Sequence, residues 1–122
     1  MQLLHEELTK AIIGASMEVL NTLKPGLDEK VYERALVVEL AERCHRIDQQ
    51  RRFSVVYKDL LVGELVPDLI VDETVIVDLK VVTGFSDSHV AQMIGYLAIT
   101  GLSTGLLVNF HGAELKWKRV VR

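Results

Sequence analysis

The chain is poor in cysteine and has no long apolar run, and each shortage excludes a class of protein. A single cysteine, Cys44, excludes an internal disulfide, and the four histidines lie too far apart for zinc-finger spacing. No stretch approaches the roughly 20 apolar residues that cross a bilayer. The N-terminus also lacks the basic-then-apolar order of a signal peptide. We therefore expect a cytoplasmic protein that does not enter a membrane.

An excess of positive charge is also absent. The 14 Lys and Arg residues are outnumbered by 17 Asp and Glu residues, which gives a formal net charge of -3. This balance argues against a protein that coats duplex DNA through bulk attraction, but it permits a nucleic-acid enzyme with a local basic rim. The basic clusters are Arg51 with Arg52, and Lys116 and Lys118 with Arg119 and Arg122. Each cluster alone is interpreted as a solvated strand surface.

The length of the chain predicts a single domain over residues 1–122, and its hydrophobic periodicity predicts that the domain begins with two helices. A chain of 122 residues is large enough for one core but leaves no room for a second. Apolar residues recur at three- and four-residue intervals in the first segment, at Leu4, Leu8, Ile12, Ala15, Val19 and Leu23. This helix should end at Pro25-Gly26. A second helix is predicted from Asp28 to about His45.

The remainder of the chain has mainly the period of strands. The predicted strands cover residues 53–57, about 61–71, 75–82, 105–110 and 114–121. A third helix, capped by Ser86 or Ser88, should reach Thr100 and end at Gly101. The predicted order is α-α-β-β-β-α-β-β. It indicates an α/β fold of the α+β type, with helices packed on a mixed sheet.

Charged residues interrupt two of the predicted strands. Asp68 lies within the apolar run 65–71, and Asp78 and Lys80 lie within the run 75–82. Ionised groups in half-buried strands cost free energy unless they are paired or bind a metal. The segment from Asp68 to Lys80 is therefore the first candidate for a functional site.

The length of the turn between these strands decides whether the two aspartates meet. If residues 72–74 form a three-residue turn, Val71 pairs with Val75 and Asp68 lies opposite Asp78. Their Cβ atoms would then be about 4.5–5.5 Å apart. A two-residue turn would place the aspartates on opposite faces of the sheet, because successive side chains alternate.

Two facing carboxylates repel each other unless a cation lies between them. Hard oxygen ligands at this spacing suit Mg²⁺ or Mn²⁺. Lys80, on the same face as Asp78, would then orient a water nucleophile or stabilise charge that develops on a phosphate. The residues alone leave an alternative open, a buried Asp–Lys salt bridge with Asp68 accepting backbone hydrogen bonds.

Several motifs of the chain match one family in order. Pro67-Asp68, nine further residues and then Asp78-Leu79-Lys80 resemble the signature of the PD-(D/E)xK nuclease superfamily. Gly26, Glu29 and Tyr32 fit the GxxExxY motif of a small-protein family within that superfamily. Further matches are Gln92 with Tyr96, the strand 105–110 that ends in Asn-Phe, and the basic segment 116–121. The resemblance covers the chain from about Ile12 to Arg122.

The resemblance implies a restriction-endonuclease-like core with an Mg²⁺ or Mn²⁺ site and no other cofactor. By position, Glu29 is the helix acid, Asp68 and Asp78 are metal ligands, and Lys80 is the catalytic lysine. Gln92 matches a helix residue that supports the metal site or a phosphate. The family commonly has Glu where this chain has Asp78. The superfamily signature accepts either acid, although the shorter side chain could shift the metal geometry.

Other polar residues have simpler interpretations. Tyr32 is predicted to pack in the core and to hydrogen-bond through its hydroxyl. Asp72 and Asp87 are interpreted as turn and cap residues. His89 is a weaker candidate for a general base.

The leading functional hypothesis is a small Mg²⁺-dependent nuclease that hydrolyses phosphodiester bonds in DNA. The alternative is a catalytically weak or inactive nuclease-like module that binds nucleic acid or acts as an accessory. A third is a structural domain whose strand charges are salt-bridged. Domains of this size often dimerise to grip a duplex, so a homodimer is an open alternative.

Overall fold

The structure, a computed structural model, describes residues 5–122, so Leu4 of the predicted helical stripe lies outside the described residues. The helices are α1 (Glu6–Leu23), α2 (Glu29–Glu42) and α3 (Asp87–Thr100). The strands are β1 (Ile47–Gln49), β2 (Phe53–Tyr57), β3 (Leu60–Leu65), β4 (Leu69–Val71), β5 (Val75–Lys80), β6 (Thr104–Asn109) and β7 (Lys116–Val121).

The main sheet has five strands in the order β1-β4-β5-β6-β7. β5 and β6 are parallel, whereas the other neighbouring pairs are antiparallel. α3 supplies the crossover that a parallel pair needs. This mixed sheet and the helices that pack on it confirm the predicted fold class and are consistent with a restriction-endonuclease-like core.

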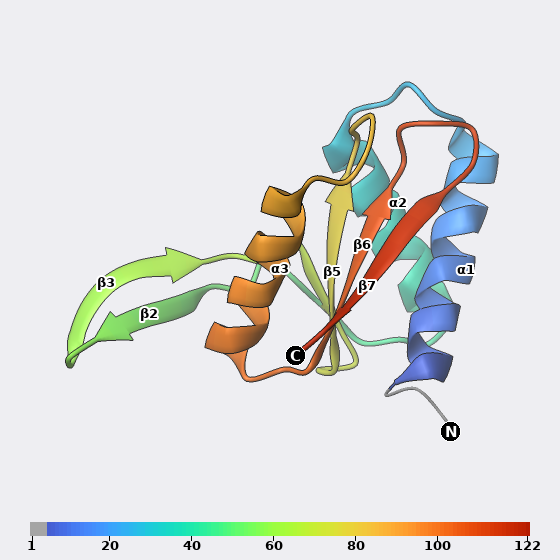
Figure 1. Ribbon diagram of the computed structural model, residues 1–122. Helices are drawn as coiled ribbons and strands as arrows, with labels where there is room; N and C mark the ends of the chain where they lie inside the picture. The colour runs from blue at the N-terminus through green and yellow to red at the C-terminus, as the bar shows by residue number, and fades with distance from the viewer. Residues whose placement is uncertain (1–4) are drawn as a thin grey trace.

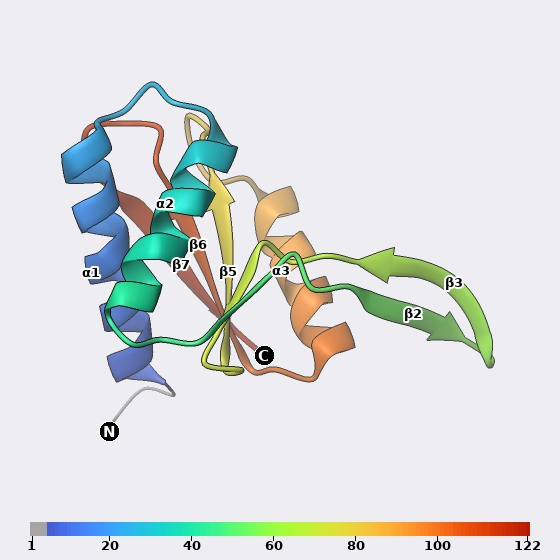
Figure 2. The same ribbon diagram turned by 180° about the vertical axis from the view of Figure 1, so that it is seen from behind.

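Helices cover both faces of the main sheet. α1 and α2 lie over one face and α3 over the other (Figures 1 and 2). On β5, Val75, Val77 and Leu79 point to what we call the α1/α2 face, where they belong to the larger hydrophobic core. The alternate residues of β5, 76, 78 and 80, point to the α3 face.

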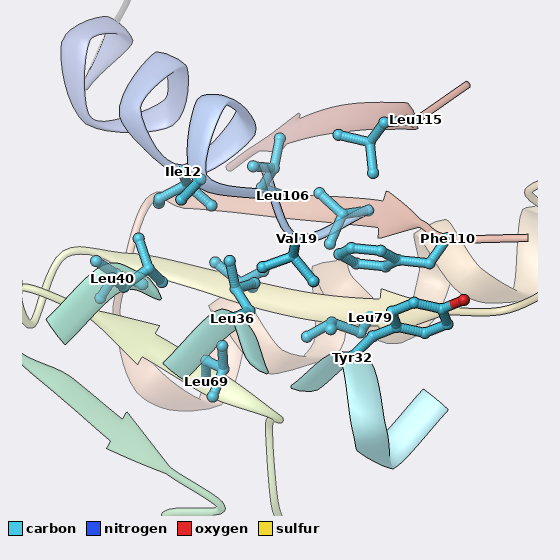
Figure 3. Packing of buried hydrophobic residues seen from close by; sticks show 14 of the residues in the cluster. Ile12, Val19, Tyr32, Leu36, Leu40, Leu69, Leu79, Leu106, Phe110 and Leu115 are labelled. Carbon is cyan, nitrogen blue, oxygen red and sulfur yellow. The ribbon is translucent and has the colours of Figure 1, made fainter. Parts of the chain in front are cut away.

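The core of the α1/α2 face fills the space between the two helices and the sheet (Figure 3). Within it the ring of Tyr32 stacks on that of Phe110, with the ring centroids 4.8 Å apart. The aromatic pair therefore connects α2 to the residue that follows β6.

Gly105 leaves room for α3 to pack on the sheet, and a residue at each end of α3 caps the helix. A Cβ at Gly105 would lie 2.3 Å from the Sδ of Met93, so any larger residue here would displace the Met93 side chain that packs between α3 and β6. Ser86 caps the start of α3 by accepting a hydrogen bond from the N–H of His89. Gly101, with a φ of 80°, ends it as predicted.

β2 and β3 form a separate two-stranded ribbon, residues 53–65, that we call the arm. Figure 1 shows the arm extending away from the main sheet on the side of α3. Its turn lies at Lys58 and Asp59, as predicted, and both residues have positive φ. Near the turn it exposes large apolar side chains, those of Val56, Tyr57, Leu60, Leu61 and Val62.

The predicted element order is wrong in two places, since the observed order is α-α-β-β-β-β-β-α-β-β. The strand predicted over 61–71 is divided at residues 66–68 into β3 and β4. Pro67 has no N–H to donate to a ladder, and the chain changes sheets at this point. β1 was not predicted, because three residues are too short to show an alternating pattern.

The helices carry no sign of a membrane span. Within residues 5–122, no helix is both long and apolar enough to cross a bilayer.

Candidate nuclease site

The turn between β4 and β5 has the odd length that brings the two aspartates together. Val71 pairs with Val75 across a three-residue turn, which confirms the predicted register. Asp72 and Glu73 accommodate the tight reversal with φ values of 52° and 55°. Continuing the ladder by one step places Asp68 opposite Asp78, both on the α3 face.

Asp68 is half-buried and in an unfavourable place for a negative charge. Its Oδ2 accepts a hydrogen bond from the N–H of Leu79 at 2.9 Å. Burial first, and then the facing carboxyl of Asp78, raise the pKa of Asp68 to about 7. At neutral pH the pair therefore holds less negative charge than two ordinary carboxylates would.

Lys80 lies between the acid pair and α3. Its Nζ is 2.8 Å from Asp78 Oδ2, and it donates to the Oε1 of Gln92 at 3.3 Å. Asp78 Oδ2 is buried, and its partner is the Lys80 ammonium in a close ion pair. The structure thus brings Lys80, Gln92 and Asp78 together in one connected group.

The Tyr96 hydroxyl belongs to the same neighbourhood. Burial raises the pKa of Tyr96 to about 12, and the charges of Asp78 and Asp68 add to this effect. The phenol therefore stays protonated at neutral pH and can donate a hydrogen bond beside the acid pair.

Glu29 begins α2 and lies close enough to Lys80 and Asp78 to interact with their charges. Its side chain is exposed. Partial burial raises its pKa, with Lys80 acting against this shift and Asp78 reinforcing it. Glu29 therefore shares an electrostatic environment with both residues.

Tyr32 fixes the segment from which Glu29 projects. Its hydroxyl donates to the carbonyl of Lys24 at 2.6 Å and accepts from the N–H of Leu27 at 3.1 Å. These bonds hold the loop before α2, and the stacked Phe110 holds the ring. The geometry agrees with the structural role predicted for Tyr32.

A second buried acid, Glu33, was not predicted from the sequence. It lies one helical turn after Glu29 and is 1% exposed. Its Oε2 accepts hydrogen bonds from the side chains of Gln49, at 2.8 Å, and Gln50, at 3.0 Å. The only sequence signal was its spacing of four residues from Glu29, which places both acids on one side of α2.

Gln50 connects this acid to Asp68. Its Nε2 lies 3.0 Å from Glu33 Oε2 and 3.4 Å from Asp68 Oδ1, and its backbone N–H donates to the carbonyl of Asp68 at 2.9 Å. Gln50 has a φ of 56°, an unusual value for a residue other than glycine. The structure thus holds an amide between two carboxylates that would otherwise repel each other.

Asn109 fixes the backbone just beyond Lys80. Its Oδ1 accepts from the N–H of Val82 at 3.1 Å, and its Nδ2 donates to the carbonyl of Val82 at 2.7 Å. These bonds join the end of β6 to the chain that follows β5. The Asn-Phe pair of the sequence motif therefore holds the site in place.

Other polar residues of the sequence have structural partners away from this site. The Nδ1 of His89 accepts a hydrogen bond from the N–H of Ser86 in the cap of α3. Asp72 lies 2.7 Å from the Nδ1 of His45 and accepts from the N–H of Arg46 in its turn. Cys44 is exposed.

The donor set fits a hard divalent cation only in part. Two facing carboxylates are ligands of the kind that Mg²⁺ prefers, and the Oδ2 of Asp78 is already paired with the Nζ of Lys80. Within residues 5–122, however, no three His, Cys, Asp or Glu side chains are grouped closely enough to hold one ion. The convergence of Glu29 with Asp68 and Asp78 on a metal stays a prediction.

Comparison with known proteins identifies the family. A family model described as the PD-(D/E)XK nuclease superfamily matches residues 6–120, which is nearly the whole chain. No curated protein and no solved structure matches it. The chain belongs to the PD-(D/E)XK nuclease superfamily, whose members are generally nucleases that use divalent metals.

Proposed function

We propose that this member of the PD-(D/E)XK nuclease superfamily is a Mg²⁺- or Mn²⁺-dependent nuclease that hydrolyses phosphodiester bonds in DNA. The observation that carries the proposal is the group formed by Asp68, Asp78 and Lys80. Two acids face each other across one turn, and a lysine Nζ lies 2.8 Å from the more deeply buried of them. The match of the GxxExxY motif to Glu29 and Tyr32 adds support.

Asp68 and Asp78 are the residues that would hold the ion, with Glu29 reaching it directly or through water. When bound, the ion would act as a Lewis acid on a phosphoryl oxygen. Two protein carboxylates suffice for Mg²⁺, because this ion usually keeps several of its waters.

Lys80 has two tasks that its position permits. Its ammonium can orient the attacking water, and it can stabilise the negative charge that develops on the phosphate in the transition state. Gln92 holds the ammonium from α3 through its Oε1, 3.3 Å away. We assign Gln92 the role of positioning Lys80.

Substitution of Asp68 provides the direct test of this proposal. Asp68→Asn keeps the shape of the side chain and an oxygen that can accept from Leu79. It should lower Mg²⁺- or Mn²⁺-dependent cleavage of linear, nicked and branched DNA by at least about 100-fold. Lys80→Met should do the same, with a thermal melt to establish that it folds.

The matched controls are Glu7→Gln and Lys10→Ala, which remove an exposed acid and an exposed lysine from α1 on the opposite side of the sheet. Both controls should cleave as the wild type does. Equal cleavage by the wild type, Asp68→Asn and a folded Lys80→Met would refute the proposal.

The second candidate function is a nuclease-like module that binds nucleic acid or acts as an accessory without turnover. It is favoured by the lack of a third acid grouped with the pair within residues 5–122. Calorimetric binding of Mn²⁺, together with no cleavage of any DNA or RNA substrate, would support this candidate over the nuclease.

A further inference from the structure

The pairing register of the main sheet extends the candidate site toward its outer strand. Asp78 pairs with Leu107, which pairs with Lys118, and Lys80 pairs with Asn109, which pairs with Lys116. Paired residues of neighbouring strands point to the same face. Lys116 and Lys118 therefore lie on the α3 face. Lys118 is in register with Asp78, and Lys116 is in register with Lys80, each two strands away.

The distance between these lysines and the site follows from strand spacing. Neighbouring strands lie about 4.8 Å apart, so residues two strands away are separated by roughly 10 Å. A strand of duplex DNA advances about 3.4 Å along the axis for each phosphate. A strand that crosses the sheet from a phosphate bound at Asp68, Asp78 and Lys80 therefore reaches the two lysines within about three nucleotide steps.

Both lysines lie on an open part of the sheet. Lys116 and Lys118 are exposed, whereas Val120, the next residue of β7 on this face, is buried in the core under α3. Arg122 donates to the carbonyl of Leu97, which ties the end of β7 to α3. The start of β7 lies away from α3 (Figures 1 and 2).

Ion pairing within the chain leaves these charges available. Lys116 has one carboxylate partner, Glu114, at 3.6 Å, and the Glu114 side chain is 84% exposed. A pair of this kind contributes little. For Lys118 the structure of residues 5–122 gives no ion pair.

Protection of a sheet edge is the simpler explanation for lysines on an outer strand. Edge protection does not account for the register of these two lysines with Asp78 and Lys80. The facing carboxylates of the site would repel a polyanion, and the chain has a net charge of -3. Cations beside the site would offset this repulsion locally.

We propose that Lys116 and Lys118 bind backbone phosphates of the nucleic acid that lie within about three nucleotides of the scissile one. The strand would then cross the α3 face from β5 to the outer strand β7. This inference rests on the proposed nuclease function, since the lysines would place a substrate across the acid pair. They are positioning residues and take no part in the chemical step.

The test is the salt dependence of DNA binding, measured by fluorescence anisotropy in EDTA so that nothing is cleaved. Each phosphate contact contributes about 0.9 to the slope of log K against log salt on duplex DNA. The double variant Lys116→Ala/Lys118→Ala should therefore bind more weakly and lose about 1.8 from the slope. Lys116→Arg/Lys118→Arg should restore both affinity and slope.

The matched control is Lys10→Ala/Arg34→Ala, which removes the same charge from exposed positions on α1 and α2. It should keep the wild-type slope. In steady-state cleavage the alanine double variant should raise KM about 10-fold or more while kcat stays within about twofold.

The two proposals fail in distinguishable ways. Wild-type binding with an unchanged slope in the alanine double variant would overturn the role of the lysines and leave the nuclease proposal standing. A loss of kcat with an unchanged KM would also overturn it. Absence of any nucleic-acid binding by the wild type would overturn both proposals.

Discussion

The two faces of β5 differ in what a substitution should do to them. On the α1/α2 face, Val75, Val77 and Leu79 are completely buried among apolar neighbours. On the α3 face, buried Asp78 forms an ion pair with partly exposed Lys80, and Asp78 opposes a second acid. One face stabilises the fold through burial, and the other holds charges that cost stability.

This difference between adjacent side chains explains how so short a strand can carry a site. Because side chains alternate, the α1/α2 face can fix the backbone while the α3 face presents the reactive groups. Natural proteins commonly lose some stability at functional sites. The comparison therefore predicts that truncating an apolar side chain on the α1/α2 face destabilises the fold, whereas removing the charge of Asp68 on the α3 face stabilises it.

The largest expected loss of stability is on the apolar face. Leu79→Ala should lower the free energy of unfolding by about 2–5 kcal/mol, the usual cost of removing a fully buried leucine side chain. Urea denaturation at equilibrium measures this change. An effect below about 1 kcal/mol would show that this face is not the main stabilising one.

The next prediction tests whether metal binding and cleavage at the α3 face depend on the Gln50 side-chain amide, which lies between Glu33 and Asp68. Gln50→Met keeps the length of the side chain but removes the donor that contacts both acids. Loss of such supporting contacts typically costs about 10- to 100-fold in metal affinity or activity. Calorimetry with Mn²⁺ and cleavage rates would measure both.

Gln49→Met is the matched control, because within residues 5–122 the Gln49 side chain hydrogen-bonds to Glu33 and has no hydrogen bond to Asp68. It should change metal affinity by less than Gln50→Met does. Equal effects of the two variants would assign the role to Glu33 alone.

The contrast between the two faces could be predicted from the sequence, whereas the connection through Gln50 could not. Side chains alternate strictly along a strand, so a turn of odd length was enough to place Asp68 opposite Asp78. That relation is local, set by a few consecutive bonds. The assignment of Gln92 to the neighbourhood of Lys80 came instead from the resemblance to the nuclease superfamily.

The link from Glu33 through Gln50 to Asp68 joins a helix, the end of a three-residue strand and the residue before β4. No periodic pattern marks β1, and no residue type announces the positive φ of Gln50. The separate arm was missed for a related reason. Its strands have the same alternation as those of the main sheet, and only Pro67 indicated that the chain changes sheets.

A smaller effect of opposite sign is expected from Asp68→Asn. The raised pKa of Asp68, about 7, means that the folded protein binds a proton more tightly than the unfolded chain does. This group therefore contributes stability at low pH that is lost as the pH rises from about 4 through 7. The asparagine variant avoids this loss and should be more stable than the wild type by roughly 1–2 kcal/mol at pH 8 in EDTA.

Thermal unfolding at pH 5 and pH 8 measures the effect. The wild type should lose stability between the two values, and the variant should lose less. Added Mn²⁺ should stabilise the wild type at pH 8 but not the variant. A wild-type melting temperature that does not fall between pH 5 and pH 8 in EDTA would contradict the raised pKa.

The smallest effect is expected at the other end of the same hairpin, at Asp72. Partial burial would raise its pKa, but the hydrogen bonds from His45 and the Arg46 N–H outweigh burial and lower it. Asp72 therefore contributes stability above its ordinary pKa, and this contribution is lost as the pH falls through the lowered value. Because the Asp72 side chain is about a third exposed, solvent screens the interaction, and Asp72→Asn should cost less than about 1 kcal/mol at pH 7. Urea denaturation should show this difference at pH 7 and its disappearance near pH 3. A difference that persists at pH 3 would mean that the turn depends on the shape of Asp72 and not on its charge. Asp68 and Asp72, at the two ends of the hairpin, would then not respond to pH in opposite directions.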